Sequence, residues 1–119
     1  MYRSADFGQS WSWRGHAGNT GGRNGNPPAL AVTAGGRLCC VYGERDTCRM
    51  IATFSTDHGA TWKDAVILRG DFQRDRFNDA DLGYARVIRR ADGMLVACYY
   101  WATAQSPHQH IAATIWNPG

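Results

Sequence analysis

Residues 55–62 read S-T-D-H-G-A-T-W and residues 4–11 read S-A-D-F-G-Q-S-W, so the pattern S-x-D-x-G-x-[ST]-W occurs twice, 51 residues apart. Such self-similarity within a chain of 119 residues indicates a structural repeat. In a turn of this kind the aspartate accepts backbone N–H groups, the glycine takes a positive φ, and the tryptophan packs the turn onto a sheet. We therefore expect a structural role for the shared residues Ser4, Asp6, Gly8, Trp11, Ser55, Asp57, Gly59 and Trp62.

A second, looser repeat has an offset of 57 residues. Residues 36–42 (G-R-L-C-C-V-Y) align with residues 93–99 (G-M-L-V-A-C-Y), and each copy has a short apolar run before and after it. Short apolar runs separated by Gly, Asp and Asn turns indicate strands, and no helical periodicity competes with them. The sequence predicts an antiparallel unit with strands at 29–33, 37–42, 50–55 and 65–69.

Four strands with a period of 51–57 residues are typical of a β-propeller blade, which has about 40–50 residues. We therefore expect an all-β fold, part of a propeller: residues 1–20 would end one blade, 26–70 would form a complete blade, and 82–119 would form an incomplete third. Propellers close with about 4–8 blades. Residues 1–119 are therefore expected to be the C-terminal part of a larger domain, completed by the same polypeptide or by oligomerisation.

Composition and charge exclude several function classes. Thirteen Lys and Arg against ten Asp and Glu leave a net charge of +3, and the basic residues are scattered, which argues against nucleic acid as a partner. The longest uncharged apolar stretch, residues 94–102, is far shorter than the ~20 residues that span a bilayer. The N-terminal stretch 1–11 (M-Y-R-S-A-D-F-G-Q-S-W) lacks the apolar core of a signal peptide.

The cysteines do not suggest a metal site. They show no C-x-x-C spacing, and the adjacent Cys39 and Cys40 would point to opposite faces of a strand. We expect Cys39, Cys40, Cys48 and Cys98 to be buried free thiols. No metal and no cofactor is predicted.

The repeated motif is the Asp box of the sialidase-type (BNR-repeat) β-propellers, and the chain resembles this family over essentially its whole length. Residues 81–100 and 111–116 are similar to the C-terminal region of bacterial sialidase-like proteins, and residues 24–30 with 41–45 are similar to the preceding blade. The resemblance implies a glycoside hydrolase of the exo-α-sialidase type, which removes terminal sialic acid from glycoconjugates. Asp boxes also occur in non-enzymatic propellers such as sortilin-like receptors. A non-catalytic propeller that binds carbohydrate or protein is therefore the alternative, and the chain is expected to be inactive by itself.

The connections of an antiparallel unit lie alternately at its two ends. The Asp boxes should therefore share one end with the turns at 34–36 and 91–93, and the opposite end should carry the other loops. Ligands usually bind to loops on a rigid scaffold, and the substrate of sialidases binds at the end opposite the Asp boxes. There the resemblance implies Tyr84 as a catalytic nucleophile, because a neutral group can approach a sugar that carries a carboxylate on its anomeric carbon. The alternative is that Tyr84 packs as an inner-strand aromatic residue.

The same end carries the candidate substrate-binding residues Arg45, Arg86, Asp81 and Asn26. Sialidases grip the substrate carboxylate with three arginines, since guanidinium groups form charged bidentate contacts. The alternatives for Arg45 and Arg86 are that they are solvated or bridge two blades. Asp79 and Asp81 could orient Arg86 or cap a turn, and His108 and His110 are expected to be surface residues. Two departures qualify the resemblance: the motif reads G-Y-A-R rather than A-Y-S, and the contexts of the sialidase acid/base Asp and of its Glu partner are not found. A glycan is the expected partner, while the sugar, the linkage and the compartment stay open.

Overall fold

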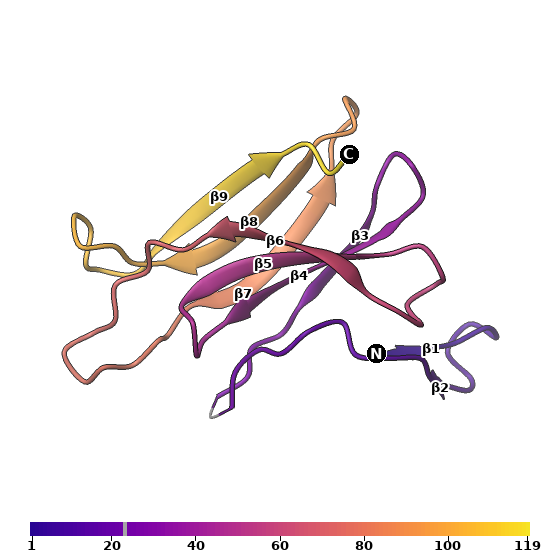
Figure 1. Ribbon diagram of the computed structural model, residues 1–119, viewed down its shortest axis with the longest axis horizontal. Coiled ribbons are helices and arrows are strands. Elements are labelled where there is room, and N and C mark those ends of the chain that lie inside the picture. The colour runs from indigo at the N-terminus through magenta and orange to yellow at the C-terminus, as the bar shows by residue number, and fades with distance from the viewer. Residues whose placement is uncertain (23) are drawn as a thin grey trace.

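The computed structural model describes residues 1–22 and 24–119, and in this part of the chain every regular element is a β-strand (Figure 1). The prediction of an all-β fold is confirmed. The sheets are antiparallel, and none of them closes on itself among the described residues. The strands are β1 (Tyr2–Arg3), β2 (Ser12–Trp13), β3 (Ala29–Val32), β4 (Leu38–Glu44), β5 (Arg49–Ser55), β6 (Lys63–Arg69), β7 (Gly83–Arg89), β8 (Leu95–Trp101) and β9 (His110–Trp116).

Each sheet follows the order of its strands in the sequence. The sheets are β1-β2, β3-β4-β5-β6 and β7-β8-β9. The four strands expected within 26–70 all form, and their observed bounds differ from the expected ranges by up to two residues. Hairpin connections explain this order, because short turns after glycine or aspartate return the chain beside the strand that it has just left.

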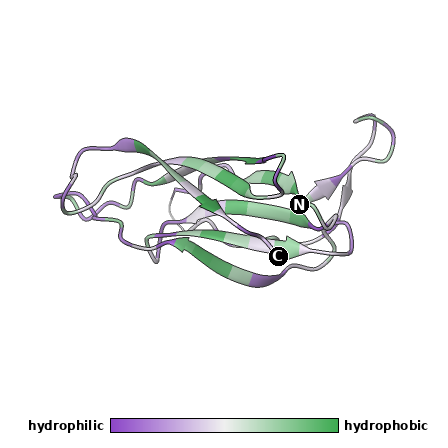
Figure 2. Ribbon diagram, turned by 90° about the horizontal axis from the view of Figure 1, so that it is seen from above, coloured by the Kyte–Doolittle hydropathy of each residue, from purple (hydrophilic) through white to green (hydrophobic). Residues whose placement is uncertain are grey.

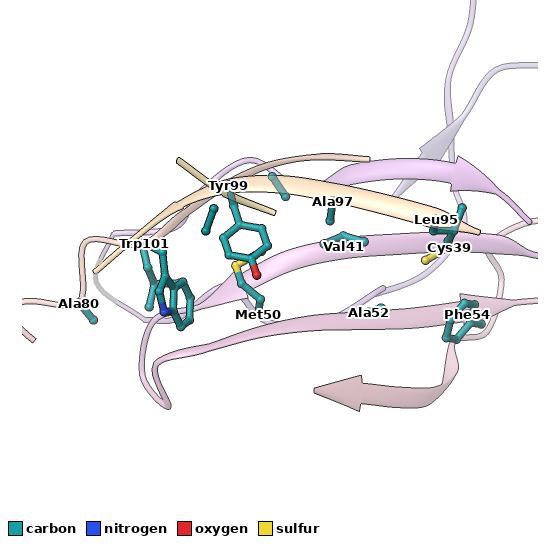
Figure 3. Packing of buried hydrophobic residues seen from close by; sticks show 13 residues of the cluster. Cys39, Val41, Met50, Ala52, Phe54, Ala80, Leu95, Ala97, Tyr99 and Trp101 are labelled. Atoms are coloured by element: carbon teal, nitrogen blue, oxygen red, sulfur yellow. The ribbon is translucent and has the colours of Figure 1, made fainter. Parts of the chain in front are cut away.

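The two larger sheets lie face to face, and the main core lies between them (Figures 2 and 3). Period-two alternation determines which side chains enter this core. In β8, Leu95, Ala97, Tyr99 and Trp101 are buried, whereas Cys98 on the other face is exposed. From the first sheet, side chains that include Val41, Met50 and Phe54 meet them.

The outer face of the first sheet is covered by the segment that leads to β3. Ala17 accepts a hydrogen bond from Thr53 Oγ1 at 2.9 Å, and a Cβ at Gly18 would lie 2.2 Å from the Tyr42 ring. Cys40, Tyr42 and Ile51 form a second buried cluster on this side. Strands β4 and β5 are therefore buried on both faces, which explains why most of their residues are apolar.

The cysteine prediction is only partly right. All four thiols are free, and the neighbours Cys39 and Cys40 lie in different clusters on opposite faces, as expected. Burial was predicted wrongly for Cys98, which is exposed, and Cys48 is half-buried. The reason is that Cys98 lies on the face of the β7-β8-β9 sheet that turns away from the core.

The two Asp-box turns have the same internal geometry. Asp57 accepts hydrogen bonds from Ser55 Oγ at 2.8 Å and from the Thr61 amide and hydroxyl at 2.9 and 2.6 Å, and Trp62 Nε1 donates to the Gly59 carbonyl at 3.1 Å. The turn of Asp6 repeats each of these contacts through Ser4, Ser10, Gly8 and Trp11. Gly59 and Gly8 have φ values of 85° and 89°. These contacts hold each turn together, and Trp62 also packs against the cluster of Cys40, Tyr42 and Ile51, whereas Trp11 is 64% exposed and lacks the packing expected of it.

These hydrogen bonds lower the pKa of both aspartates, most through the hydroxyl donors of Thr61 and Ser10. The pKa of Asp6 falls from 3.8 to about 2, and that of Asp57 is also lowered. A carboxylate whose pKa is lower in the folded state stabilises the fold above its unfolded pKa of about 3.9, and this contribution is lost as the pH falls through the folded value.

We expect Asp57→Asn to lower the free energy of unfolding at pH 7 and to flatten its decline between about pH 4 and pH 2. Urea unfolding monitored at a series of pH values measures both effects. The matched variant is Asp6→Asn, whose turn lies on the exposed β1-β2 hairpin and should matter less to global unfolding. Equal pH profiles for Asp57→Asn and the unmodified protein would contradict the expectation.

The connections alternate between two ends, as predicted. The Asp-box turn between β5 and β6 shares one end with the β3-β4 and β7-β8 turns, toward the right in Figure 1. The links β4-β5, β6-β7 and β8-β9 lie at the opposite end, toward the left. This second end gathers the candidate site residues.

Candidate functional site

An open hollow of about 740 Å³ lies at the end of the sheets opposite the Asp boxes. We name it the tyrosine hollow, and it is lined by Asn24, Gly25, Arg45, Asp81, Tyr84 and Tyr100. These residues come from the segment before β3, the end of β4, the start of β7 and the end of β8. Three of the predicted site residues, Arg45, Asp81 and Tyr84, are therefore brought together.

Arg45 ties three segments of the hollow to one another. Its Nε donates to the Leu82 carbonyl at 3.1 Å and its Nη1 to the Asn24 carbonyl at 2.7 Å. Its Nη2 donates to Asp81 Oδ1 at 3.2 Å and to the Tyr100 hydroxyl at 2.8 Å. These four bonds occupy four of the five N–H groups of a guanidinium. Arg45 therefore acts mainly as a positioning residue, with little donor capacity left for a ligand carboxylate.

Asp81 is the carboxylate at the centre of this network. Besides Arg45, it accepts hydrogen bonds from the Tyr100 hydroxyl and from Gln109 Nε2, the latter to Oδ2 at 2.8 Å. Burial acts to raise the pKa of Asp81, but the bonds from Tyr100 and Gln109 and the charge of Arg45 outweigh it and lower the pKa. Asp81 is therefore ionised at neutral pH. Burial and the bond to Asp81 raise the pKa of Tyr100, which stays protonated.

Tyr84 has an unusual backbone conformation for an aromatic residue. Its φ is 53°, after Gly83 with a φ of 118°, and a β-bulge lies between Gly83 and Arg86 in the pairing of β7 with β8. Bulges redirect side chains and recur beside functional sites. Here the residue is 52% exposed, and the centroid of its ring lies 5.6 Å from that of Tyr100. Tyr84 thus projects at the rim rather than into the core, unlike an inner-strand packing residue.

Asn26 lies under the tyrosine hollow and does not line it. It is buried, its Nδ2 donates to the Gly43 carbonyl at 2.9 Å, and its Oδ1 accepts from the Gly43 amide at 3.3 Å. The side chain also fills the space that a Cβ at Gly83 would occupy. Asn26 therefore supports the backbone before Tyr84, and a ligand in the hollow would not touch it without a rearrangement.

Arg86 is not brought into the hollow. It is exposed on the face of β7 that turns away from the core, and its Nη1 donates to the carbonyl of its neighbour Ala85 at 2.9 Å. Asp79 accepts a bond from the amide of its neighbour Ala80 at 2.8 Å, whereas the adjacent turn is capped by Asp75, which accepts from the Phe77 and Asp79 amides. His108 is exposed in the β8-β9 loop, and His110 starts β9.

Tyr100, Gln109 and Asn24 belong to the site but were not predicted. Tyr100 pairs with Gly83 across β7 and β8, so it meets Asp81 only through the pairing of these strands. Gln109 reaches Asp81 from the next loop. Successive side chains of β8 point to opposite faces of the sheet, so Tyr100 lies on the face opposite to the buried Tyr99 and Trp101. This alternation is the one sequence pattern from which the position of Tyr100 could have been inferred.

Within residues 1–22 and 24–119, no three His, Cys, Asp or Glu side chains converge in a way that would hold a metal ion. No helix in this range is long and apolar enough to cross a membrane. In the tyrosine hollow, Arg45, Asp81 and Tyr100 are hydrogen-bonded to one another, and the Tyr84 phenol is the exposed group that they leave for a ligand. Comparison of the chain with protein-family models, with curated proteins and with solved structures returned no match.

Proposed function

We propose that this chain is part of a sialidase-like β-propeller and that it contributes Tyr84 as the nucleophile of an exo-α-sialidase. The observation that carries the proposal is the exposed Tyr84 ring, held at a positive φ in a hollow that it shares with an ionised Asp81, at the end opposite two Asp-box turns. Strained backbone at an exposed aromatic residue is typical of functional sites.

The arrangement of the sheets supports the propeller. Strand β7 lies against β3 and β4, so the first strands of the two sheets are neighbours. Neighbouring first strands are expected when successive blades surround a common axis. The outer face of β7-β8-β9 exposes Ile88, Ile111 and Ile115, an apolar surface suited to a further sheet.

In the proposed reaction the Tyr84 oxygen attacks the anomeric carbon, and the bond from this carbon to the leaving oxygen breaks. The phenol proton passes to a base, and the leaving oxygen takes a proton from an acid. Water then cleaves the tyrosyl-glycosyl bond, so the configuration is retained. A phenol needs this base because the pKa of a free tyrosine side chain is about 10. The base and the acid are expected from other parts of the propeller.

The roles of the other residues follow from their contacts. The bonds that Asp81 accepts from Tyr100 and Arg45 hold the floor of the tyrosine hollow in one arrangement. Tyr100 packs beside the Tyr84 ring and limits its rotation. Preorganisation of this kind lowers the entropic cost of reaching the attacking geometry.

The test is covalent labelling of the complete propeller, which supplies the base and the acid, by a fluorinated sialic-acid analogue that would trap the tyrosyl-glycosyl intermediate. We expect the added mass on the tryptic peptide of residues 77–86, which contains Tyr84 as its only tyrosine. Tyr84→Phe should abolish the label because the attacking oxygen is removed. The matched control is Tyr2→Phe, which changes another exposed tyrosine outside the hollow and should leave the label intact. A label on another residue would refute the assignment.

The alternative is a non-catalytic propeller that binds carbohydrate or protein at the same end. In its favour, the Tyr84 hydroxyl has no hydrogen-bond partner among the described residues, and Asp81 and Arg45 are occupied by each other and by Tyr100. Under this alternative a glycan binds reversibly, and the fluorinated analogue leaves the mass of the protein unchanged.

A further inference from the structure

Strand β9 forms an outer edge of the β7-β8-β9 sheet, and among the described residues it pairs only with β8 (Figure 1). Its pairing with β8 continues from His110 to Trp116 without a register shift. No backbone hydrogen bond from another part of the described chain reaches the other side of this strand. A row of N–H and C=O groups is therefore open to a further strand.

Strand β9 lacks the features that protect the outer edge of the other large sheet. Folded proteins protect such edges with charged side chains, bulges or proline. The edge strand β6 has Lys63, Asp64 and Arg69, and its pairing with β5 has two register shifts. Strand β9 reads H-I-A-A-T-I-W, without Lys, Arg, Asp, Glu, Gly or Pro. This contrast indicates that the edge of β9 is suited to pairing and that the edge of β6 is not.

The sequence of β9 is nearly symmetric about its central residue, Ala113. When two β9 strands pair antiparallel with the two copies of Ala113 opposite each other, Ile111 of one copy lies opposite Ile115 of the other. Both isoleucines lie on the outer face and are 78% and 52% exposed, so each such pair would bury apolar surface. No like charges face each other in this register. The remaining pairs are Ala112 with Thr114 and His110 with Trp116.

We infer that β9 is a dimerisation edge, which pairs with β9 of a second copy of the chain about a two-fold axis at Ala113. A two-fold axis places identical strands antiparallel and closes the assembly at two copies. In the first sheet the third strand, β5, pairs with a fourth strand, β6. In the dimer, β9 of the second copy takes the place of this fourth strand, and the two three-stranded sheets join into one of six strands. No residue of β9 lines the tyrosine hollow, so the inference does not depend on the proposed reaction.

The experiment is sedimentation equilibrium of the chain over a range of concentrations, combined with hydrogen exchange of the β9 amides. We expect twice the mass of the monomer at high concentration and dissociation on dilution. Successive N–H groups of a strand point to opposite sides, so an open edge leaves alternate amides unprotected. We therefore expect the amides of residues 111–115 to be protected throughout in the dimer, and alternate ones to lose protection on dilution.

Two substitutions at Ala113 test the position of the axis. Ala113 is exposed at mid-strand, and Ala113→Lys would place two lysines opposite each other, which should raise the Kd of the dimer roughly three- to tenfold. Ala113→Glu should weaken the dimer for the same reason. A mixture of the two variants should form dimers again, because opposite charges then face each other. The matched control is Ala65→Lys, at an exposed alanine of the edge strand β6, and it should leave the Kd unchanged.

A chain that stays monomeric at every concentration would overturn the inference. A dimer whose Kd does not respond to Ala113→Lys would overturn it as well. Ile88→Lys identifies the surface used in that case, because Ile88 is 64% exposed on the outer face of β7, away from the β9 edge, and its effect would indicate face-to-face association. Circular dichroism verifies that each variant is folded, and the exchange measurement on the unmodified chain needs no variant. The labelling experiment tests the proposed function separately from all of these outcomes.

Discussion

Replacement of Gly83 by alanine is expected to lower the free energy of unfolding by about 3–5 kcal/mol. Gly83 has a φ of 118°, which a residue with a Cβ rarely adopts. A Cβ there would lie 2.3 Å from Asn26 Oδ1 and 2.6 Å from its Cγ. The buried amide cannot move aside without losing its hydrogen bonds to Gly43, so the cost combines backbone strain with unsatisfied polar groups.

Two further variants separate these causes. Gly36→Ala also places a Cβ at a positive φ, 82°, but nothing lies within 4 Å of it, so it should cost only about 1–2 kcal/mol. In a double-mutant cycle of Gly83→Ala with Asn26→Ala, the double variant should lose less than the sum of the single ones, because Asn26→Ala removes the side-chain atoms with which the new Cβ would clash. Urea midpoints measure the stability of every variant. Equal losses for Gly83→Ala and Gly36→Ala would contradict the steric argument.

Gly83→Ala also bears on the site. The bulge that begins at Gly83 redirects Tyr84 toward the rim, so a change of backbone there should move the Tyr84 ring away from Tyr100. In the labelling experiment, folded Gly83→Ala protein should therefore react more slowly than the unmodified protein.

The second large effect is expected for Trp101→Ala, at about 3–5 kcal/mol. Trp101 is fully buried, with ring centroids of Phe72 and Tyr99 at 5.2 and 5.6 Å. The Arg69 guanidinium lies 5.4 Å from its ring, and Nε1 donates to Asp71 at 2.9 Å. Truncation to alanine would leave a cavity at the contact between the two sheets and free the link after β6.

Trp101→Phe retains most of the packing but loses the bond to Asp71, so about 1–2 kcal/mol is expected. The control is Trp11→Ala, at a residue that is 64% exposed on the first Asp box, and it should cost no more than about 1 kcal/mol. Guanidinium unfolding followed by far-UV circular dichroism avoids the change in tryptophan fluorescence. A loss at Trp101→Ala as small as that at Trp11→Ala would contradict the argument that truncation leaves a destabilising cavity.

Most strands could be predicted because their signals are local. Alternation in β8 and the Gly and Asp turns on both sides of β4 are properties of neighbouring residues, and the observed bounds of β3 to β6 differ from the predicted ones by no more than two residues. Burial was harder to predict. Cys40 and Cys98 both lie in mid-strand, yet the first is covered by the segment around Ala17 and the second is exposed. Which sheet face is covered depends on distant parts of the chain.

The candidate site was predictable only in part for the same reason. Arg45, Asp81 and Tyr84 could be assigned to one end because antiparallel connections alternate. The residues around Asn26 in the sequence did not indicate that its side-chain amide is hydrogen-bonded to the backbone of Gly43. Those around Arg86 did not indicate that its side chain lies outside the tyrosine hollow. The partners Tyr100 and Gln109 became visible only when β7, β8 and the β8-β9 loop were paired in space.

The repeated S-x-D-x-G-x-[ST]-W motif shows which contacts the local sequence determines and which depend on the tertiary structure. Its hydrogen bonds join residues at most four positions apart, so these eight-residue segments specify their own turns, and both copies form them alike. The contacts of Arg45 with Asp81 and Tyr100 span 36 and 55 residues. Such contacts depend on the stacking of two sheets, because only burial of the shared core brings the ends of separate strands within hydrogen-bonding distance.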